Sequence, residues 1–308
     1  MSIILLQYCY KFTKIVNDVL TPFSIPIVLS LFYTNTTPEV RLPLPLTRSS
    51  MLRLQHATLS FKTQPVKDDY RIAKFIVKNT YYEPIYDYFL NERKKIGYRG
   101  YTLGQTCYSP FIDIQISWLG QEQFCYELTD NYDAILSLYE IMRKNHLEMY
   151  HVVADSPAEY ILYGGNIVPE MVGPGRIRDF VLPCWQVFAE ILHERGKKLG
   201  VHLDADNRRI IDIVEQSPLD FIEAFTPPPD CSVSVKEAHS AWPDKALWIN
   251  FPSSVHIRDD AFIEKMTLKI LQEAGKRERF LMGITEDIPI EHIERSLSVI
   301  LNIIEKYR

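Results

Sequence analysis

The chain has 308 residues, of which 46% are hydrophobic and 12% aromatic, so it can bury a large core as one barrel or as two modest domains. Its net charge of -5 excludes the basic surface that binding to a phosphate backbone requires, and we expect no nucleic-acid partner. Five scattered cysteines without a Cys-x-x-Cys pair favour a reducing compartment, which predicts a cytoplasmic protein, over a disulfide framework or a cysteine-rich zinc module.

Residues 1–65 carry the least regular pattern. The apolar stretch from Val19 to Tyr33 is shorter than the roughly twenty residues that a membrane span needs, so we expect no membrane association. A signal peptide is an open alternative, although a basic start ahead of the apolar run and a small-residue cleavage site after it are missing. We interpret the region as an N-terminal extension of unclear structure, in which a strand or helix packs on the main domain.

A helical lead-in and one strand come next. One helix is predicted to start at Lys67, with apolar residues at helical spacing. A second helix has Pro84 in its first turn and ends at Gly97. Residues 100–107 are predicted to form a strand, and residues 131–145 a helix with one apolar side.

Beyond residue 149, apolar runs alternate with helical patterns. The predicted strands are 159–165, 198–204, 220–225, 246–251 and 279–285, and the predicted helices are 174–195, 207–216, a short one near Val235, 259–274 and 290–307. This alternation is typical of a parallel sheet with helices outside it. We therefore predict an α/β fold, a (β/α)8 TIM barrel over residues 66–308. An open doubly wound sheet is the alternative, but the Gly-rich phosphate loop of a dinucleotide site is missing.

Polar side chains stand where these strands end, at the edge where a barrel places its active site. They are Asn166, His202, Asp204, Glu223, Asn250 and Glu286. Because residues two apart on a strand share a face, His202 and Asp204 should project together. An imidazole beside a carboxylate can bind a metal or move a proton. A core histidine bonded to a strand-end aspartate, and scattered capping residues, are the simpler alternatives.

Several tracts resemble the uroporphyrinogen decarboxylase-like superfamily, which includes barrel methyltransferases that move methyl groups between corrinoid and thiol. In chain order they are YILYGGNIVPEMVGPGRIRDFVLP, GKKLGVHLDAD, FIEAFTPPP, WINFPSSV and GITEDIP. The earlier tract DDYRIAKFIVKNTYYEPIYDYF resembles the helical lead-in of an uncharacterised bacterial branch of that family. The resemblance implies a barrel enzyme over the chain after residue 65.

The resemblance also implies a metal site. The methyltransferase branch has a His-x-Cys strand end and a later Gly-Cys-x-Ile-Pro turn, which together hold zinc. Here Asp204 follows His202 at the first position, and Glu286 falls where the later cysteine would stand. Carboxylates in place of thiolates make a harder site that favours an oxygen-bearing substrate over a thiol. The expected cofactor is a divalent metal, zinc first, with a corrinoid carried by a partner protein as a further expectation.

The remaining polar residues receive roles from their positions. Glu223, Asn250 and Tyr163 are candidate catalytic residues, and Asn166 and Arg176 are candidate substrate-binding residues. Tyr163 could equally be a core residue. The VGPGR turn that holds Arg176 most simply starts a helix, and an anion bound at that helix start is the second interpretation.

Two other functions stay open beside methyl transfer on a small substrate. The first is decarboxylation of a porphyrinogen-like substrate, which needs fixed cations at its carboxylates. Arg48 and Arg53 lie in the appropriate region but without the arginine-bearing motif of that branch. The second is a non-catalytic barrel that binds a small ligand. The oligomeric state is not predicted.

Overall fold

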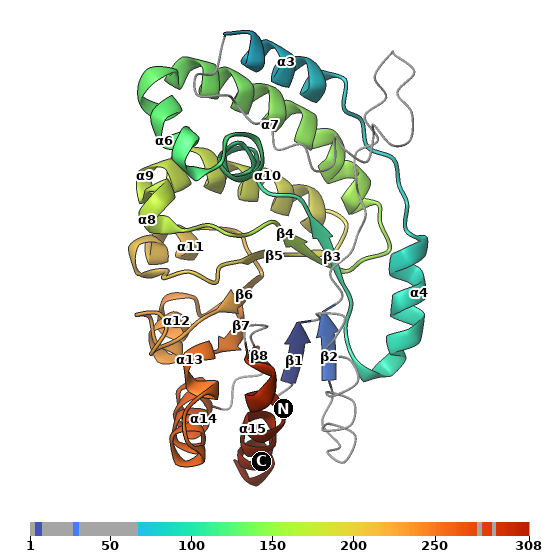
Figure 1. Ribbon diagram of the computed structural model, residues 1–308. Helices are drawn as coiled ribbons and strands as arrows, with labels where there is room; N and C mark the ends of the chain where they lie inside the picture. Colours follow the sequence, from blue (N-terminus) through green and yellow to red (C-terminus); the bar gives the residue numbers. More distant parts are fainter. Residues whose placement is uncertain (1–3, 8–26, 31–66, 276–278, 285–287, 308) are drawn as a thin grey trace.

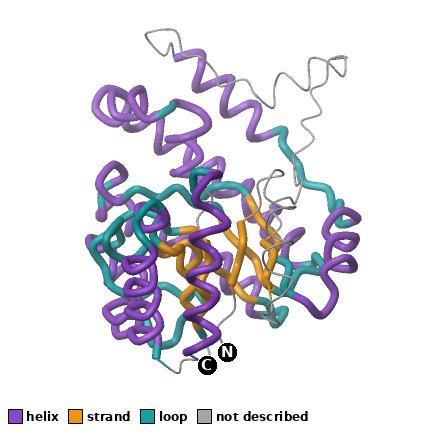
Figure 2. The backbone as a smooth tube through the Cα atoms, turned by 60° about the horizontal axis from the view of Figure 1, so that its bottom comes forward, coloured by secondary structure: helices purple, strands orange, loops and turns teal. Residues whose placement is uncertain are grey.

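The computed structural model describes residues 4–7, 27–30, 67–275, 279–284 and 288–307. Eight strands in these ranges form one sheet in the order β2-β1-β8-β7-β6-β5-β4-β3, and every described pair is parallel. This is the cyclic strand order of a TIM barrel, with no pairing described between β2 and β3. Figure 2 shows the strands at the centre with helices around them. The predicted α/β fold of the TIM-barrel type is confirmed.

The strands are short and most lie where the sequence predicts them. They are β1 (Ile4–Gln7), β2 (Ile27–Ser30), β3 (Leu103–Thr106), β4 (Tyr160–Tyr163), β5 (Lys198–His202), β6 (Phe221–Phe225), β7 (Ala246–Phe251) and β8 (Phe280–Ile284). The last six fall within the predicted ranges. The sequence predicted a strand or helix packed on the main domain in the N-terminal extension, without bounds; β1 and β2 are two strands of this extension, and they join the sheet because β1 pairs with β8 and β2 with β1. The domain border at residue 66 stays a prediction.

Helices follow most strands (Figure 1). They are α3 (Lys67–Lys78), α4 (Asp87–Ile96), η1 (Gly97–Arg99), α5 (Pro110–Asp113), η2 (Ile114–Leu119), α6 (Gln121–Asp130), α7 (Tyr132–Ala154), α8 (Pro169–Val172), α9 (Pro174–Arg176), η3 (Ile177–Val181), α10 (Leu182–His193), η4 (Arg208–Ile210), α11 (Ile211–Glu215), α12 (Val235–Ala241), α13 (Ser253–His256), α14 (Asp260–Ala274) and α15 (Ile290–Tyr307). In this described part of the chain, no helix is both long and apolar enough to cross a bilayer.

Three helical predictions need correction. α4 starts at Asp87 rather than around Pro84. The segment before it is held against α7 instead, because Tyr86 Oη donates to the carbonyl oxygen of Val152 at 2.7 Å. α7 continues to Ala154, since its buried face continues through Met149 and Val153. α5, η2 and α6 were not predicted. The helical lead-in lies between β2 and β3, so two strands precede it.

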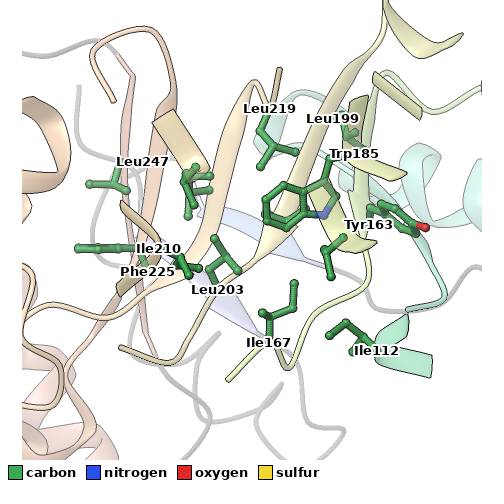
Figure 3. Packing of buried hydrophobic residues seen from close by; sticks show 14 of the residues in the cluster. Ile112, Tyr163, Ile167, Trp185, Leu199, Leu203, Ile210, Leu219, Phe225 and Leu247 are labelled. Carbon is green, nitrogen blue, oxygen red and sulfur yellow. The ribbon is translucent and has the colours of Figure 1, made fainter. Parts of the chain in front are cut away.

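Apolar side chains on the strands alternate between two environments. One set packs against the helices in the main core, including Tyr163, Leu199 and Leu247 (Figure 3). The other set lies on the opposite face of the sheet and forms a smaller cluster, which we call the interior layer: Leu103, Leu162, Phe221 and Trp248. The alternation follows from the period of two along a strand, and it assigns the face on which each later strand residue lies.

Two buried histidines should make the fold sensitive to acid. His146 of α7 is 4% exposed and His256 of α13 is 0% exposed, and burial lowers the pKa of each to about 4. A histidine in the unfolded chain titrates near 6.5. As the pH falls from about 6.5 to 4, these two histidines therefore become protonated in the unfolded chain but stay neutral in the folded chain. The free energy of unfolding should decrease over this range. Urea titrations across this pH range measure the effect.

The variant His146→Leu should flatten part of that pH dependence. Within the described residues His146 Nδ1 is buried without a hydrogen-bond partner. An apolar replacement therefore breaks no hydrogen bond there and removes the free-energy cost of burying an unpaired polar atom. The matched control is His151→Leu, which changes an exposed histidine of the same helix. A pH dependence that is the same in wild type and His146→Leu would contradict this account.

Candidate functional site

The interior layer fills the middle of the sheet's inner face, and two glycines make room for it. A Cβ atom at Gly200 would lie 2.1 Å from the Phe221 ring, and one at Gly283 would lie 2.7 Å from Trp248 Nε1. Contacts this short are impossible, so the two large rings require glycine on the neighbouring strands. Apolar side chains of β3, β4, β6 and β7 therefore occupy this part of the inner face at mid-height, and His202 and Glu223 follow them toward the carboxyl end.

At the carboxyl end, three ionisable side chains form a line from the interior to solvent. His202 and Glu223 are register partners on β5 and β6, and each lies two residues after a residue of the inner face. His202 Nδ1 lies 2.5 Å from Glu223 Oε2, and the Glu223 side chain is 0% exposed. His202 Nε2 lies 3.5 Å from Asp204 Oδ2, and the Asp204 side chain is 45% exposed. Both ring nitrogens thus face carboxylates.

This arrangement holds the imidazole in its charged form. Burial disfavours the charge on His202, but attraction from Glu223 together with hydrogen bonds to Asp204 and Glu223 outweighs burial and raises the pKa of His202 to about 10. The hydrogen bond from His202 in turn lowers the pKa of Asp204, against the effect of burial. The raised pKa keeps the imidazole of His202 protonated at neutral pH, with its two N–H groups directed to the carboxyl groups of Glu223 and Asp204.

Two glycines at the end of β4 position the His202 ring. A Cβ at Gly165 would lie 2.6 Å from His202 Cβ and 2.8 Å from its Cδ2, so the ring packs directly on this backbone. Gly164 has a φ of 44° and leaves room for the backbone of Cys107 and Tyr108, where a Cβ would come within 2.8 Å of the Cys107 oxygen. The sequence YGG therefore joins β3, β4 and the histidine of β5.

The backbone beside Glu223 is strained. Ala224 has a φ of 60°, which is rare for a residue with a side chain, and the pairing of β6 with β7 shifts register between Ile222 and Phe225. Strain of this kind costs on the order of 1 to 3 kcal/mol and is concentrated at functional sites. The irregular stretch includes Glu223 and presents its carbonyl oxygen to Leu203 N at 2.9 Å, so it joins β6 to the end of β5.

The other predicted site residues occupy varied places. Asn166 is exposed at the end of β4, and its Nδ2 donates to Tyr108 Oη at 2.8 Å. Asn250 is 8% exposed and lies two residues after Trp248, on the inner face. Arg176 lies in α9 and donates to the carbonyl oxygen of Val172 at 3.2 Å. Glu286 lies outside the described residues.

Tyr163 lies on the helix side of β4 instead of beside His202. It is 2% exposed, its hydroxyl is 2.6 Å from that of Tyr150, and its ring meets Phe188 edge-on at 5.1 Å between centroids. Figure 3 shows it among the apolar side chains of the main core. This is the core position that the sequence left open, and the position does not support a catalytic role.

Two aspartates that sequence reasoning missed join the loops at this end. Asp206, after β5, accepts hydrogen bonds from Ser232 N at 3.0 Å and Ser232 Oγ at 2.9 Å, in the loop after β6. Asp230, in that second loop, accepts from Ser253 Oγ and Ser254 N at 3.1 Å each, after β7. Clusters of Asp and Ser between predicted elements were the available signal. The loops after β5, β6 and β7 are thereby linked.

The described residues around His202 were predicted to hold a metal ion, and they bring together two possible donor atoms. Among them, no group of three or more His, Cys, Asp or Glu side chains has a geometry that could hold a metal ion. His202 Nε2 and Asp204 Oδ2 supply two donor atoms, and their 3.5 Å separation is close to the roughly 3.3 Å between two ligands of one tetrahedral zinc ion. The place of Glu286 in such a site stays a prediction.

Fold and position together define an α/β protein of the TIM-barrel class with an ionisable cluster at the carboxyl end of its strands. No family model matches the chain. No curated protein matches it either. Among solved structures, a methyltransferase from Methanosarcina mazei matches with a TM-score of 0.53 and 13% identity, over 77% of this chain and 65% of that chain. This chain thus spans less than two thirds of that methyltransferase, and the likeness shows a shared fold.

Two further solved structures match with lower TM-scores. A glycoside hydrolase family 5 enzyme from Prevotella bryantii B14 matches with a TM-score of 0.44 and 11% identity, over 77% of this chain and 85% of that one. The IolI protein with a bound zinc atom matches with a TM-score of 0.40 and 10% identity, over 100% of this chain and 99% of that one.

Removing the space beside His202 should displace its ring. In Gly165→Ala the new methyl group cannot fit 2.6 Å from His202 Cβ, so the ring must turn and its contact with Glu223 should lengthen. We expect the pKa of His202, followed by NMR, to fall toward the usual histidine value. The matched control is Gly175→Ala in α9, where a Cβ would meet no atom within 4 Å. An unchanged pKa in Gly165→Ala would contradict the role of this glycine.

Neutralising Glu223 should also lower the pKa of His202. In Glu223→Gln we expect a decrease of at least about one unit from the wild-type value of about 10, because the buried negative charge is gone. In the wild type, the interactions of protonated His202 contribute their full stabilisation below about pH 6.5, and this stabilisation is lost as the pH rises through about 10. The variant should lose part of that alkaline dependence, whereas Glu140→Gln, on exposed α7 surface, should keep it.

Proposed function

We propose that this protein is a barrel enzyme that transfers a methyl group to or from a small oxygen-bearing substrate with the help of a divalent metal ion, zinc first, held by His202 and Asp204. The observation that carries the proposal is the line of Glu223, His202 and Asp204 at the carboxyl end of the strands. Active sites of TIM barrels lie at this end. The fold shared with a methyltransferase agrees with the reaction class.

The position of Glu223 supports a metal-binding role for His202. A metal-bound imidazole commonly donates its other N–H to a carboxylate, which fixes the ring and makes it a better ligand. Glu223 stands at 2.5 Å from Nδ1 in this way, fully buried, and leaves Nε2 directed to Asp204 and solvent. A metal bound there would act as a Lewis acid on a substrate oxygen. Glu286 is the proposed third ligand.

The surroundings favour a small substrate that is neutral or carries a single charge. The inner face below the cluster is apolar, with Trp248 and Phe221, while Asn250 lies on the same face beside it. The Asn166 and Tyr108 pair adds hydrogen-bonding groups at the edge. In contrast, Arg208 of this rim is already paired with Glu237 at 3.0 Å, while Arg176, which donates to the carbonyl oxygen of Val172, can take a single carboxylate but not the several of a polyacid. These features disfavour decarboxylation of a porphyrinogen.

A second candidate function is proton transfer without a metal. The observation in its favour is that both nitrogens of His202 face carboxylates, which suits an imidazole that gives and recovers a proton. In that reaction Glu223 would orient the ring and Asp204 would exchange the proton with substrate. A corrinoid partner, implied by the resemblance alone, stays a prediction for the methyl-transfer function.

Metal affinity should depend steeply on pH. Binding must displace the proton on His202 Nε2, and because the pKa of His202 is about 10, the affinity should rise about tenfold per pH unit between pH 6 and 9. Competition with a chromophoric chelator measures this for zinc, cobalt and manganese. Asp204→Asn, a change of ligand, and Glu223→Gln, a change of its support, should each weaken by at least about tenfold the affinity that remains after correction for the proton bound to His202, because both variants also lower the pKa of His202 and so reduce proton competition.

Asp212→Asn is the matched control, because this carboxylate lies in α11 and pairs with Arg178 on the surface. Glu286→Gln tests the proposed third ligand. Full metal binding in both Asp204→Asn and Glu223→Gln would rule out the proposed metal site. Turnover that persists after complete chelation, with a pH profile that shifts in Glu223→Gln, would favour the proton-transfer function instead.

A further inference from the structure

A cavity lies at the amino end of the strands, opposite the end that carries His202. Its volume is about 420 Å³, within the size range of small-molecule sites. The lining residues come from strand starts: Tyr160 and Lys198 are the first residues of β4 and β5, and Asp220 and Arg279 immediately precede β6 and β8. Lys198 and His202 are the two ends of β5, so this cavity is separate from the site at the carboxyl end.

The walls of the cavity are aromatic. Its inner limit is the amino-end side of the interior layer, with Phe221 and Trp248. At its mouth, Tyr101 and Tyr160 stand edge to face with ring centroids 5.9 Å apart, and Tyr101 is 52% exposed. A flat aromatic molecule would bury these rings, and stacked or edge-on aromatic contacts add to the gain from burial.

The charges at the mouth favour an anion. Asp220 is neutralised by Lys198 Nζ at 2.8 Å and contacts His193 Nε2 at 2.7 Å, and Asp244 has Lys245 Nζ at 3.3 Å. Arg279 is different. In the described part of the chain its guanidinium donates to an uncharged partner, the carbonyl oxygen of Asp244 at 2.7 Å. An arginine has further N–H donors in the same plane, which suit a carboxylate.

We propose that this amino-end cavity binds a small aromatic carboxylate, with its ring against Trp248, Phe221 and the two tyrosines and its carboxylate on Arg279. The site is independent of the proposed metal site, because Lys198 of the cavity and His202 of the metal site stand at opposite ends of β5. A ligand here touches Trp248 and Phe221, whose strands carry Asn250 and Glu223 two residues further on.

A charge series of one ring system tests the proposal. The probes are 2-naphthoate, 2-naphthalenemethanol and 2-naphthylmethylamine, with dissociation constants measured by calorimetry and by quenching of tryptophan fluorescence in the full chain. We expect the order anion, neutral, cation from tightest to weakest. In Arg279→Gln the affinity for 2-naphthoate should fall about tenfold, to near that of the alcohol, which should change little. Lys144→Gln, an exposed charge on α7, is the matched control.

Two further variants place the ligand in this cavity. Ala246→Phe should fill it and abolish binding of all three probes, whereas Trp248→Phe should keep binding of 2-naphthoate but lose most of the fluorescence quenching. Circular dichroism and thermal unfolding confirm that each variant is folded. The proposal is overturned if 2-naphthoate does not bind, if it binds no better than the amine, or if Ala246→Phe and Arg279→Gln bind it as wild type does.

Discussion

The interior of this protein is organised by two ring-over-glycine contacts. Phe221 occupies the space that a side chain at Gly200 would need, and Trp248 does the same at Gly283. With Leu103 and Leu162 these rings form an apolar layer at mid-height on β3, β4, β6 and β7. Among the described polar side chains of that face, His202 and Glu223 lie toward one end and Lys198 and Arg279 toward the other, while Gln105 lies level with Leu162. A substitution at either glycine would disturb both ends together.

The stability of the carboxyl end depends on the buried carboxyl group of Glu223 and its contact with His202. A fully buried carboxylate such as Glu223 is costly unless a cation and hydrogen bonds compensate it. His202 supplies both, and its own positive charge is shared with the more exposed Asp204. The strained backbone at Ala224 belongs to the same arrangement, because it lies directly after Glu223. Such an arrangement is costly for stability alone, which agrees with a functional origin.

The sequence predicted the local features well and the non-local ones poorly. Apolar runs located β3 to β8, and the period of two correctly brought His202 and Asp204 to one side. The contact between His202 and Glu223 depends on the register of two strands, which no local pattern encodes. Tyr163 was ambiguous because YILY is apolar on both faces, so alternation gave no sign of which face meets the helices. In residues 110–119, isoleucines at every second position resemble a strand, and burial on both sides overrides that preference.

The aspartates of the rim bear on how this barrel could acquire new specificity. Asp206 holds the backbone of the loop after β6, and Asp230 of that loop holds the start of α13 after β7. Exchanging the loop after β6 alone would remove the hydrogen-bond partner of Asp206 and also the partner of Ser253 and Ser254 in α13. Recombination between related barrels should therefore succeed when these three loops are exchanged together. Substitutions within a single loop are restricted to those that keep its hydrogen bonds to the other two.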